Sequence, residues 1–158
     1  MNILFVIDLQ KEFVKDKRGQ VVYDKLLEFI RKSRLEYDSV YAAVYKNGRS
    51  KNMSCILQWN EMRDIIPLDF RADKYFVHSG YYPNDVKIFS KDDKVTIVGF
   101  DTDACVLSAC FALWNDDIPI KILANGCYSS GGKKMHEAGL DIMLRQFGKA
   151  LDVKTSID

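Results

Sequence analysis

A cysteine stands where a strongly apolar segment gives way to a helical pattern, a position in which a thiol can act as a nucleophile. Residues 94–100 (KVTIVGF) lead into Asp101, Thr102 and Cys105. Thr102 is a suitable N-cap, and it would place Cys105 at the third position of the helix that follows. Because a helix start carries partial positive charge and unpaired amides, a thiolate is stabilised there. The same amides can hold the oxyanion of a tetrahedral intermediate.

Two side chains with acid–base chemistry end other apolar segments. Asp8 closes residues 2–8 (NILFVID), and His78 closes residues 74–78 (KYFVH). A carboxylate that leaves a buried strand can act as a general base, and an imidazole changes its charge near neutrality. Each alone is more often a structural residue that is satisfied by hydrogen bonds. Together with Cys105 they match the general layout of an activated cysteine nucleophile.

The other cysteines and the second histidine have no such setting. Cys110 lies five residues beyond Cys105, which turns it about 140° around a helix, so the two thiols face different ways. Cys55 and Cys127 fit the ordinary role of a small buried hydrophobe. His136 falls in a helical pattern and is interpreted as a solvated helix residue.

Apolar segments alternate with helical patterns along the chain, which indicates repeated β-α-β units. We predict one domain over residues 1–158, with a three-layer α/β/α Rossmann-like fold and a mostly parallel sheet of five or six strands. The expected strands are 2–8, 39–45, 74–78, 94–100 and 120–124, with 150–154 as a candidate sixth. The expected helices are 22–34, 54–63, 103–115 and a last helix that ends at Gly148.

The carboxyl ends of parallel strands meet at one edge of a sheet, where α/β proteins place their sites near a topological switch point. Asp8, Tyr45, His78 and the turn at 99–105 all lie at such ends. The predicted elements therefore bring the three reactive side chains to the same edge.

Composition narrows the classes of partner. The chain has 47% hydrophobic and 28% charged residues and a net charge of +1, which gives no basic field for nucleic acid. No apolar run approaches the roughly 18 residues needed to span a membrane, and residues 1–8 are too short for a signal-peptide core. We expect a cytoplasmic protein with reduced thiols, no nucleic-acid partner and no membrane partner.

Three segments resemble the isochorismatase-like cysteine hydrolases, which include nicotinamidases and carbamoylases. Residues 8–13 (DLQKEF) are similar to the opening D-x-Q-x-x-F of that family, and residues 99–106 (GFDTDACV) to its G-x-x-T-D-x-C-V. Residues 125–129 (NGCYS) resemble, more weakly, its D-A-C-x-S segment. Order and approximate spacing agree over nearly the whole chain.

The resemblance implies a catalytic Asp-Lys-Cys triad. Asp8 would be the general acid and base, and Cys105 the nucleophile that forms a thioester or a similar adduct. The oxyanion would be held by the backbone N–H groups of Asp101 and Cys105. The resemblance also implies a cis peptide bond between Phe100 and Asp101 and a pocket lined by Phe13.

The sequence departs from this pattern at the lysine. Aligning Tyr81 and Tyr82 with the tyrosine and serine of the family's K-x-x-Y-S-like segment places His78 at the lysine position. Either His78 replaces the lysine, or Lys74 or Lys87 reaches the site from elsewhere. We favour His78, because a protonated imidazole can stabilise a thiolate, although an imidazole loses its charge near neutrality.

The loop after the second strand, YKNGRSKNMS, holds no histidine and no acid, so a zinc or iron site of the nicotinamidase kind is not expected. No phosphate-binding glycine motif is present, so no nucleotide cofactor is expected either. The predicted substrate pocket draws on aromatic side chains and one amide: Phe13, Tyr45, Asn47, Trp59, Tyr81 and Phe100.

The leading hypothesis is a cofactor-free cysteine hydrolase that acts on a small-molecule amide or a related C–N bond. The alternative is a catalytically impaired family member that binds a small ligand or a protein partner. The resemblance further implies a homo-oligomer.

Overall fold

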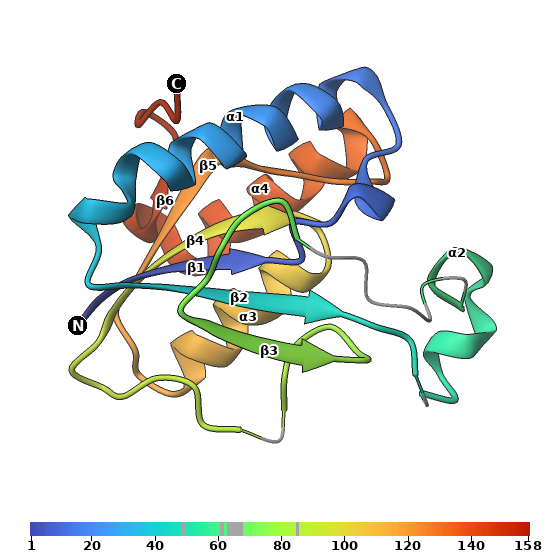
Figure 1. Ribbon diagram of the computed structural model, residues 1–158, viewed down its shortest axis with the longest axis horizontal. Helices are drawn as coiled ribbons and strands as arrows, with labels where there is room; N and C mark the ends of the chain where they lie inside the picture. The colour runs from blue at the N-terminus through green and yellow to red at the C-terminus, as the bar shows by residue number, and fades with distance from the viewer. Residues whose placement is uncertain (49, 61, 63–67, 85) are drawn as a thin grey trace.

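The computed structural model describes residues 1–48, 50–60, 62, 68–84 and 86–158. Six parallel strands form one sheet in the order β3-β2-β1-β4-β5-β6 (Figure 1). The strands are β1 (Asn2–Ile7), β2 (Ser39–Tyr45), β3 (Lys74–His78), β4 (Lys94–Phe100), β5 (Ile120–Tyr128) and β6 (Leu151–Asp152). The α-helices are α1 (Lys17–Ser33), α2 (Leu57–Asn60), α3 (Cys105–Asn115) and α4 (Lys133–Phe147), and short 3₁₀ turns are η1 (Lys11–Phe13), η2 (Arg34–Glu36), η3 (Met53–Cys55) and η4 (Gly148–Ala150).

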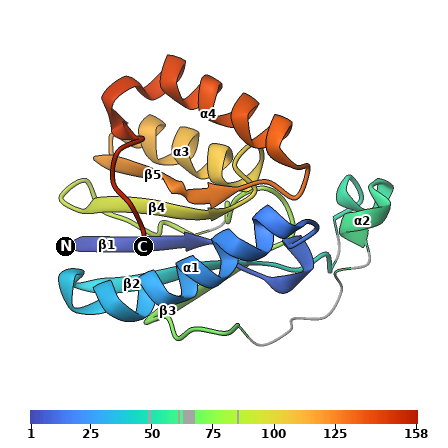
Figure 2. The same ribbon diagram turned by 90° about the horizontal axis from the view of Figure 1, so that it is seen from above.

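Helices cover both faces of the sheet, which confirms the predicted three-layer α/β/α fold. Alternate residues of β1, such as Leu4 and Val6, pack in one core with Leu26 of α1. The intervening Ile3, Phe5 and Ile7 pack in the other core, with side chains of α3 and α4. Figure 2 shows α3 and α4 together on one side of the sheet and α1 on the other. Burial on both faces explains why β1 has an almost continuous apolar sequence.

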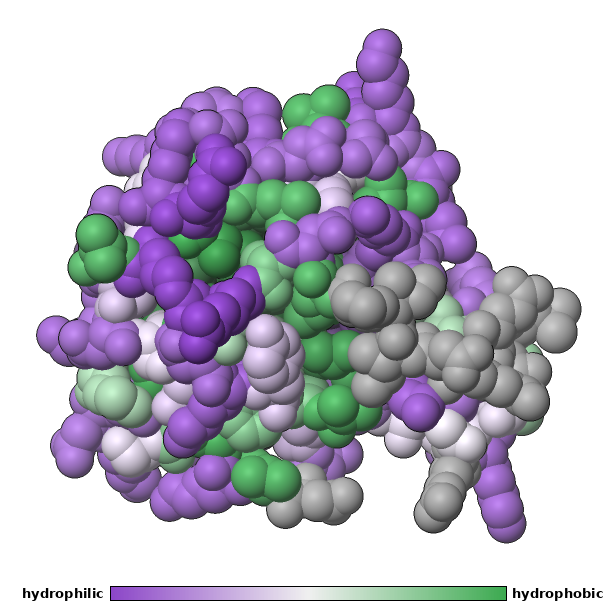
Figure 3. Space-filling model, viewed as in Figure 1, coloured by the Kyte–Doolittle hydropathy of each residue, from purple (hydrophilic) through white to green (hydrophobic). Residues whose placement is uncertain are grey.

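Helix α1 begins five residues earlier than the periodic pattern indicated. The side chain of Asp16 caps it by accepting a hydrogen bond of 2.7 Å from the backbone N–H of Gly19. Polar residues fill this first turn, so the apolar periodicity starts only at Tyr23. The outer face of the helix is polar, and Figure 3 shows mostly hydrophilic atoms along the top of the molecule, over α1.

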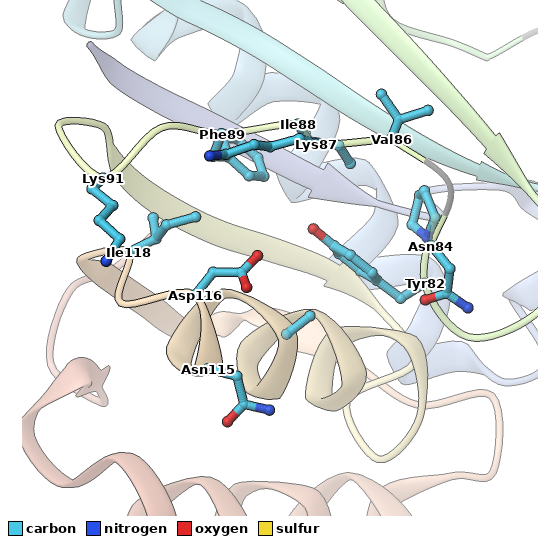
Figure 4. A pocket seen from close by; sticks show the side chains of 12 residues that line it. Tyr82, Asn84, Val86, Lys87, Ile88, Phe89, Lys91, Asn115, Asp116 and Ile118 are labelled. Carbon is cyan, nitrogen blue, oxygen red and sulfur yellow. The ribbon is translucent and has the colours of Figure 1, made fainter.

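The connection from β3 to β4 contains no helix within its described residues, 79–84 and 86–93. Its Phe89 instead covers the sheet directly, and the ring lies 5.1 Å from that of Phe5 and 5.7 Å from that of Tyr41. A cavity of about 720 Å³ lies between this segment and the carboxyl end of α3 (Figure 4). Tyr82 and Asp116 are among the side chains that line it.

Three other boundaries differ from the prediction. The expected helix at 54–63 is only η3 and α2, and residues 61 and 63 lie outside the described part of the chain. Strand β5 runs on to Tyr128, four residues farther than expected, because its pairing with β4 resumes after an irregularity between Ile97 and Gly99. Strand β6 has two residues rather than five. No described helix has both the length and the apolar character that crossing a membrane requires.

Candidate active site

The strand order reverses between β1 and β4, and the predicted reactive residues lie at this switch point. The connection through α1 packs on one face and the connection through α3 on the other, which is the arrangement that places sites beyond the strand ends in α/β proteins. Gly99 allows the two strands to approach there. Its φ is +131°, and a Cβ at this position would lie 2.0 Å from the carbonyl oxygen of Ile7.

Asp8, His78 and Cys105 meet at this point. Nε2 of His78 lies 2.8 Å from Oδ1 of Asp8, and ligand atoms of all three residues lie within 4.8 Å of one another. All three are buried, with Asp8 fully inaccessible. Asp8 adopts a positive φ of 45°, a conformation that is uncommon for a non-glycine residue and that ends β1 abruptly.

Lys74 and Lys87, the two alternatives to His78 for the lysine position of the triad, lie away from Asp8 and Cys105. Lys74 starts β3 opposite Tyr41, whereas His78 lies opposite Tyr45, so about 13 Å of strand separates them. Its ammonium lies 5.2 Å from the centre of the Tyr41 ring. Lys87 lines the separate cavity drawn in Figure 4. The structure therefore places His78, and neither lysine, beside Asp8 and Cys105.

The start of α3 differs from the prediction by two residues. Ala104 is the N-cap and Cys105 the first helical residue, and no side chain caps the helix. The prediction that Thr102 is the N-cap is wrong, because residues 102–104 form a turn in which the backbone N–H of Ala104 donates to the carbonyl oxygen of Asp101. Cys105 thus lies nearer to the exposed amides of the helix start.

Two backbone amides remain free beside the thiol. Within the described residues, the N–H groups of Asp101 and Cys105 donate no hydrogen bond, whereas Thr102 and Val106 donate to Tyr128 and Asp101. The peptide bond between Phe100 and Asp101 is cis, at the position where the sequence resemblance implies one. These amides have the chemistry of an oxyanion hole.

The electrostatic setting of Cys105 differs from the prediction. Burial raises the pKa of its thiol well above the ordinary value, and the negative charge of Asp8 acts in the same direction. The expected stabilised thiolate is therefore wrong for the resting protein. The helix start does not compensate for the loss of water and the nearby carboxylate, so Cys105 rests as a neutral thiol.

The loop after β5 is hydrogen-bonded to Asp101 and Asp103, the two acids that precede Cys105. The backbone N–H of Ser130 donates to Asp101 over 2.8 Å, and the Ser130 hydroxyl donates to the same carboxylate over 2.5 Å. The Ser129 hydroxyl donates to Asp103 over 2.5 Å. Burial raises the pKa of Asp101 to about 6, although both Ser130 hydrogen bonds oppose this shift. Of the two serines, only Ser129 belongs to a motif visible in the sequence.

His136 is part of the same region, so its interpretation as a solvated residue is wrong. Its Nδ1 lies 2.7 Å from the hydroxyl oxygen of Thr102, and this contact connects α4 to the turn before Cys105. Partial burial lowers the pKa of His136. No local sequence pattern indicates this contact, because the two residues are 34 positions apart.

An open pocket of about 580 Å³ lies over this turn. It includes two predicted residues, Trp59 and Tyr81, and both flanking acids, Asp101 and Asp103. The wall is completed by Gln58, Ser130 and Gly131, and the N-cap and one face of α3 supply Ala104, Leu107, Ser108 and Phe111. Sequence reasoning missed the residues from α3 and its N-cap, although their i, i+3, i+4, i+7 spacing from Ala104 marks a single helix face.

The other predicted pocket residues are buried around the cluster and do not line this pocket. The ring of Tyr45 packs edge-on against that of His78 at 5.7 Å, and the ring of Phe13 lies 6.1 Å from that of Tyr45. Asn47 is buried, and its amide has no hydrogen-bond partner among the described residues. Phe100 is a fully buried core residue on the α1 side of the sheet.

Asp8, His78 and Cys105 are also a set of side chains that can ligate a metal ion. They offer one oxygen, one nitrogen and one sulfur, all buried. The loop after β2, by contrast, has no histidine or acid at residues 46–48 and 50–54, so it offers no side-chain ligand of these types there.

Comparisons with known proteins agree with this fold. The family model described as "Isochorismatase domain" matches residues 2–155. The nicotinamidase PncA from Bacillus subtilis is similar in fold, with a TM-score of 0.74 and 16% identity over 95% of this chain and 98% of that one. An isochorismatase-like hydrolase from Alkaliphilus metalliredigens has a TM-score of 0.70 and 22% identity over 99% and 95%.

A third similar structure is the MAR1 ribonuclease from Caenorhabditis elegans, with a TM-score of 0.67 and 16% identity over 99% of this chain and 77% of that one. A comparison with curated protein sequences finds no match. The structural neighbours establish the fold, and the family model covers nearly the whole chain. The chain therefore belongs to the isochorismatase family.

Proposed function

We propose that this protein hydrolyses a small amide, or a related C–N bond, through a covalent intermediate on Cys105. The observation that carries the proposal is the buried cluster of Asp8, His78 and Cys105 at the switch point of the sheet. The backbone N–H groups of Asp101 and Cys105 have no acceptor among the described residues, and Asp101 and Ala104 line an open pocket that the three reactive side chains themselves do not line. A nucleophile, a base with its orienting partner, and oxyanion donors are the parts that acyl transfer needs.

In the first half-reaction, the Cys105 thiol gives its proton to Asp8 as the sulfur attacks the carbonyl carbon. The N–H groups of Asp101 and Cys105 stabilise the oxyanion that forms. The C–N bond then breaks, and the proton on Asp8 passes to the leaving nitrogen. A thioester remains on Cys105.

In the second half-reaction, water attacks the thioester and gives a proton to Asp8. The C–S bond breaks, the carboxylic acid leaves, and Asp8 returns the proton to the sulfur. Because the pKa of the resting thiol is raised, deprotonation coincides with attack rather than preceding it. Asp8 is therefore the essential base, and a preformed thiolate is not required.

His78 serves as a positioning residue in this scheme. Its Nε2 is hydrogen-bonded to Oδ1 of Asp8, and the second carboxylate oxygen has no hydrogen-bond partner among the described residues. The bond fixes the orientation of the carboxylate and leaves Oδ2 available to the thiol proton. Packing of the Tyr45 ring against the imidazole holds His78 in place.

The pocket supports a proposal for the substrate class. Trp59, Tyr81 and Phe111 offer faces on which a planar amide or a ring can stack. The charged side chains in its described lining are Asp101 and Asp103, both acidic. We therefore propose a neutral or cationic small molecule as the substrate, because an anion would meet two carboxylates.

The test is hydrolysis by the purified protein of a panel of small amides and carbamoyl compounds, nicotinamide included, read out as released ammonia or amine. Acid quenching followed by intact-protein mass spectrometry detects the acyl adduct. We expect turnover and an adduct in the wild type and in Cys55→Ala, which removes an exposed thiol away from the site. Both are lost in Cys105→Ala. An adduct that persists in Cys105→Ala would overturn the proposal.

A non-catalytic ligand-binding protein on the same fold is the second candidate, and the raised pKa of Cys105 is the observation that favours it. It predicts that panel compounds bind, as measured by calorimetry, without turnover or adduct. Homo-oligomerisation and a cytoplasmic location stay predictions, the first of which light scattering on the purified protein tests.

A further inference from the structure

We propose that Asp8, His78 and Cys105 form a binding site for a thiophilic divalent cation, with Zn²⁺ as the best match. Asp8 follows β1, His78 ends β3 and Cys105 begins α3, yet their ligand atoms lie within 4.8 Å of one another. Sulfur, imidazole nitrogen and carboxylate oxygen are the donors that Zn²⁺ takes in proteins. The metal site would thus occupy the atoms that the proposed hydrolysis uses.

The spacing of the ligand atoms suits a tetrahedral ion after small side-chain movements. Zinc–ligand bonds of about 2.0–2.3 Å place two ligand atoms roughly 3.3–3.6 Å apart. Nε2 of His78 and Oδ1 of Asp8 are 2.8 Å apart, so an ion between them needs a widening of about half an ångström. Three protein ligands leave a fourth position for water or an external ligand.

Unsatisfied polar atoms provide a second, independent indication of a ligand. Oδ2 of Asp8 and Nδ1 of His78 are buried and have no hydrogen-bond partner among the described residues. A buried polar atom without a partner costs free energy. The free carboxylate oxygen is available to the ion, while Nδ1 can carry the proton of a neutral imidazole whose Nε2 binds it.

Charge balance also favours the complex. The ion displaces the thiol proton, which is released to solvent, and the proton on Nε2 of His78 moves to Nδ1. The thiolate and the Asp8 carboxylate then neutralise both charges of the cation. A neutral complex is far less costly to bury than the isolated carboxylate.

Binding has a functional consequence that rests on the proposed hydrolase. A thiolate bound to the ion is not free to attack a carbonyl carbon, so the ion acts as a reversible inhibitor. Metal binding itself does not depend on that activity.

The test uses Co²⁺ as a spectroscopic substitute for Zn²⁺, added to reduced protein that has been treated with a chelator. We expect one Co²⁺ per chain, a thiolate-to-cobalt charge-transfer band and the visible absorption of a tetrahedral ion. Competition with Zn²⁺ should abolish both spectral features. Calorimetry in two buffers should show about one proton released for each ion bound.

Matched variants identify the ligands. We expect Cys105→Ser to remove the charge-transfer band, and His78→Lys to weaken binding at least about 100-fold, because an ammonium has no free electron pair. His78→Gln serves as a second variant should His78→Lys fold poorly, and circular dichroism checks each fold. Cys55→Ala should bind like the wild type.

An unchanged band in Cys105→Ser, or undiminished binding in both His78 variants, would overturn the metal site. Hydrolysis without Co²⁺ binding leaves the proposed function standing and refutes only the metal site. Co²⁺ binding by a protein that hydrolyses no compound of the panel supports the metal site and refutes only the proposed function.

Discussion

Nε2 of His78 lies 2.8 Å from Oδ1 of Asp8, although the two residues belong to β3 and β1, which are not adjacent in the sheet. Strand β2 lies between them, and its last residue, Tyr45, is opposite His78. The imidazole therefore reaches past a whole strand to the carboxylate. This contact links the edge of the sheet to its centre.

Replacing His78 tests whether it orients Asp8. We expect His78→Ala to lower kcat about 100-fold with a much smaller change in KM, because the carboxylate loses its fixed orientation. His78→Gln should recover about tenfold of that loss, since its amide still donates a hydrogen bond to Asp8. Steady-state kinetics on a substrate from the panel measures both. Equal losses of kcat in the two variants would show that an uncharged hydrogen-bond donor at this position is not sufficient to orient Asp8.

Alkylation of Cys105 reports its pKa. In a Cys55→Ala background, we expect iodoacetamide to react slowly at pH 7 and faster only above pH 9, because burial and Asp8 raise the pKa of the thiol. Asp8→Asn removes the negative charge and should shift the rate profile to lower pH. The rate constant as a function of pH is the measurement. A midpoint well below pH 9 in the parent protein would contradict the buried neutral thiol.

The Asp101 carboxyl should make stability depend on pH. Its pKa is about 6 in the folded protein against 3.8 in the unfolded chain, so the folded state favours the protonated form. The associated stability is present below about pH 4 and is lost as the pH rises through 6. The loss is at most about 3 kcal/mol. Urea unfolding measures it.

Asp101→Asn isolates this effect from that of carboxyls such as Asp73 and Asp93, whose lowered pKa values act in the opposite direction. The stability of the variant relative to the wild type should increase from pH 4 to pH 7. A difference that stays constant over this range would show that Asp101 titrates normally.

Gly99 should tolerate no side chain. Gly99→Ala places a Cβ 2.0 Å from the carbonyl oxygen of Ile7 and holds alanine at a φ of +131°. We expect a loss of more than about 4 kcal/mol of unfolding free energy, because the two central strands must separate. Gly80→Ala is the control, since a Cβ there meets nothing within 4 Å. Thermal unfolding of both variants decides the prediction.

The sequence predicted most of the fold because each central strand is apolar on both faces. Residues 39–45 and 94–100 have the predicted strand boundaries, and so does the edge strand 74–78, in which only His78 is buried. The same reasoning brought Asp8, His78 and Cys105 to one edge of the sheet, since each follows a strand or the turn after it. No helix was expected between residues 78 and 94, and none is found in the described part of this connection. The packing of Phe89 on the sheet was not predicted, because no local periodicity indicates that contact.

Electrostatics and loop contacts at the site escaped prediction for a related reason. The pKa of Cys105 depends on burial and on a carboxylate that lies 97 residues earlier in the sequence, between positions 8 and 105. The pairs Ser130–Asp101 and His136–Thr102 also join distant segments. Reasoning from the helix start alone therefore predicted a lowered pKa for the Cys105 thiol, whereas this pKa is raised.

The central position of β1 also determines when the proposed site can form during synthesis. Ile3 of β1 lies opposite Ser39 of β2 on one edge and opposite Val95 of β4 on the other. Strand β1 precedes both of its partners in the chain and therefore keeps one unpaired edge until residues 94–100 follow. Cys105, the proposed nucleophile, is synthesised only after them, so the proposed site cannot form before the central strands are all present. Appearance of a functional thiol site would mark completion of the central sheet during translation.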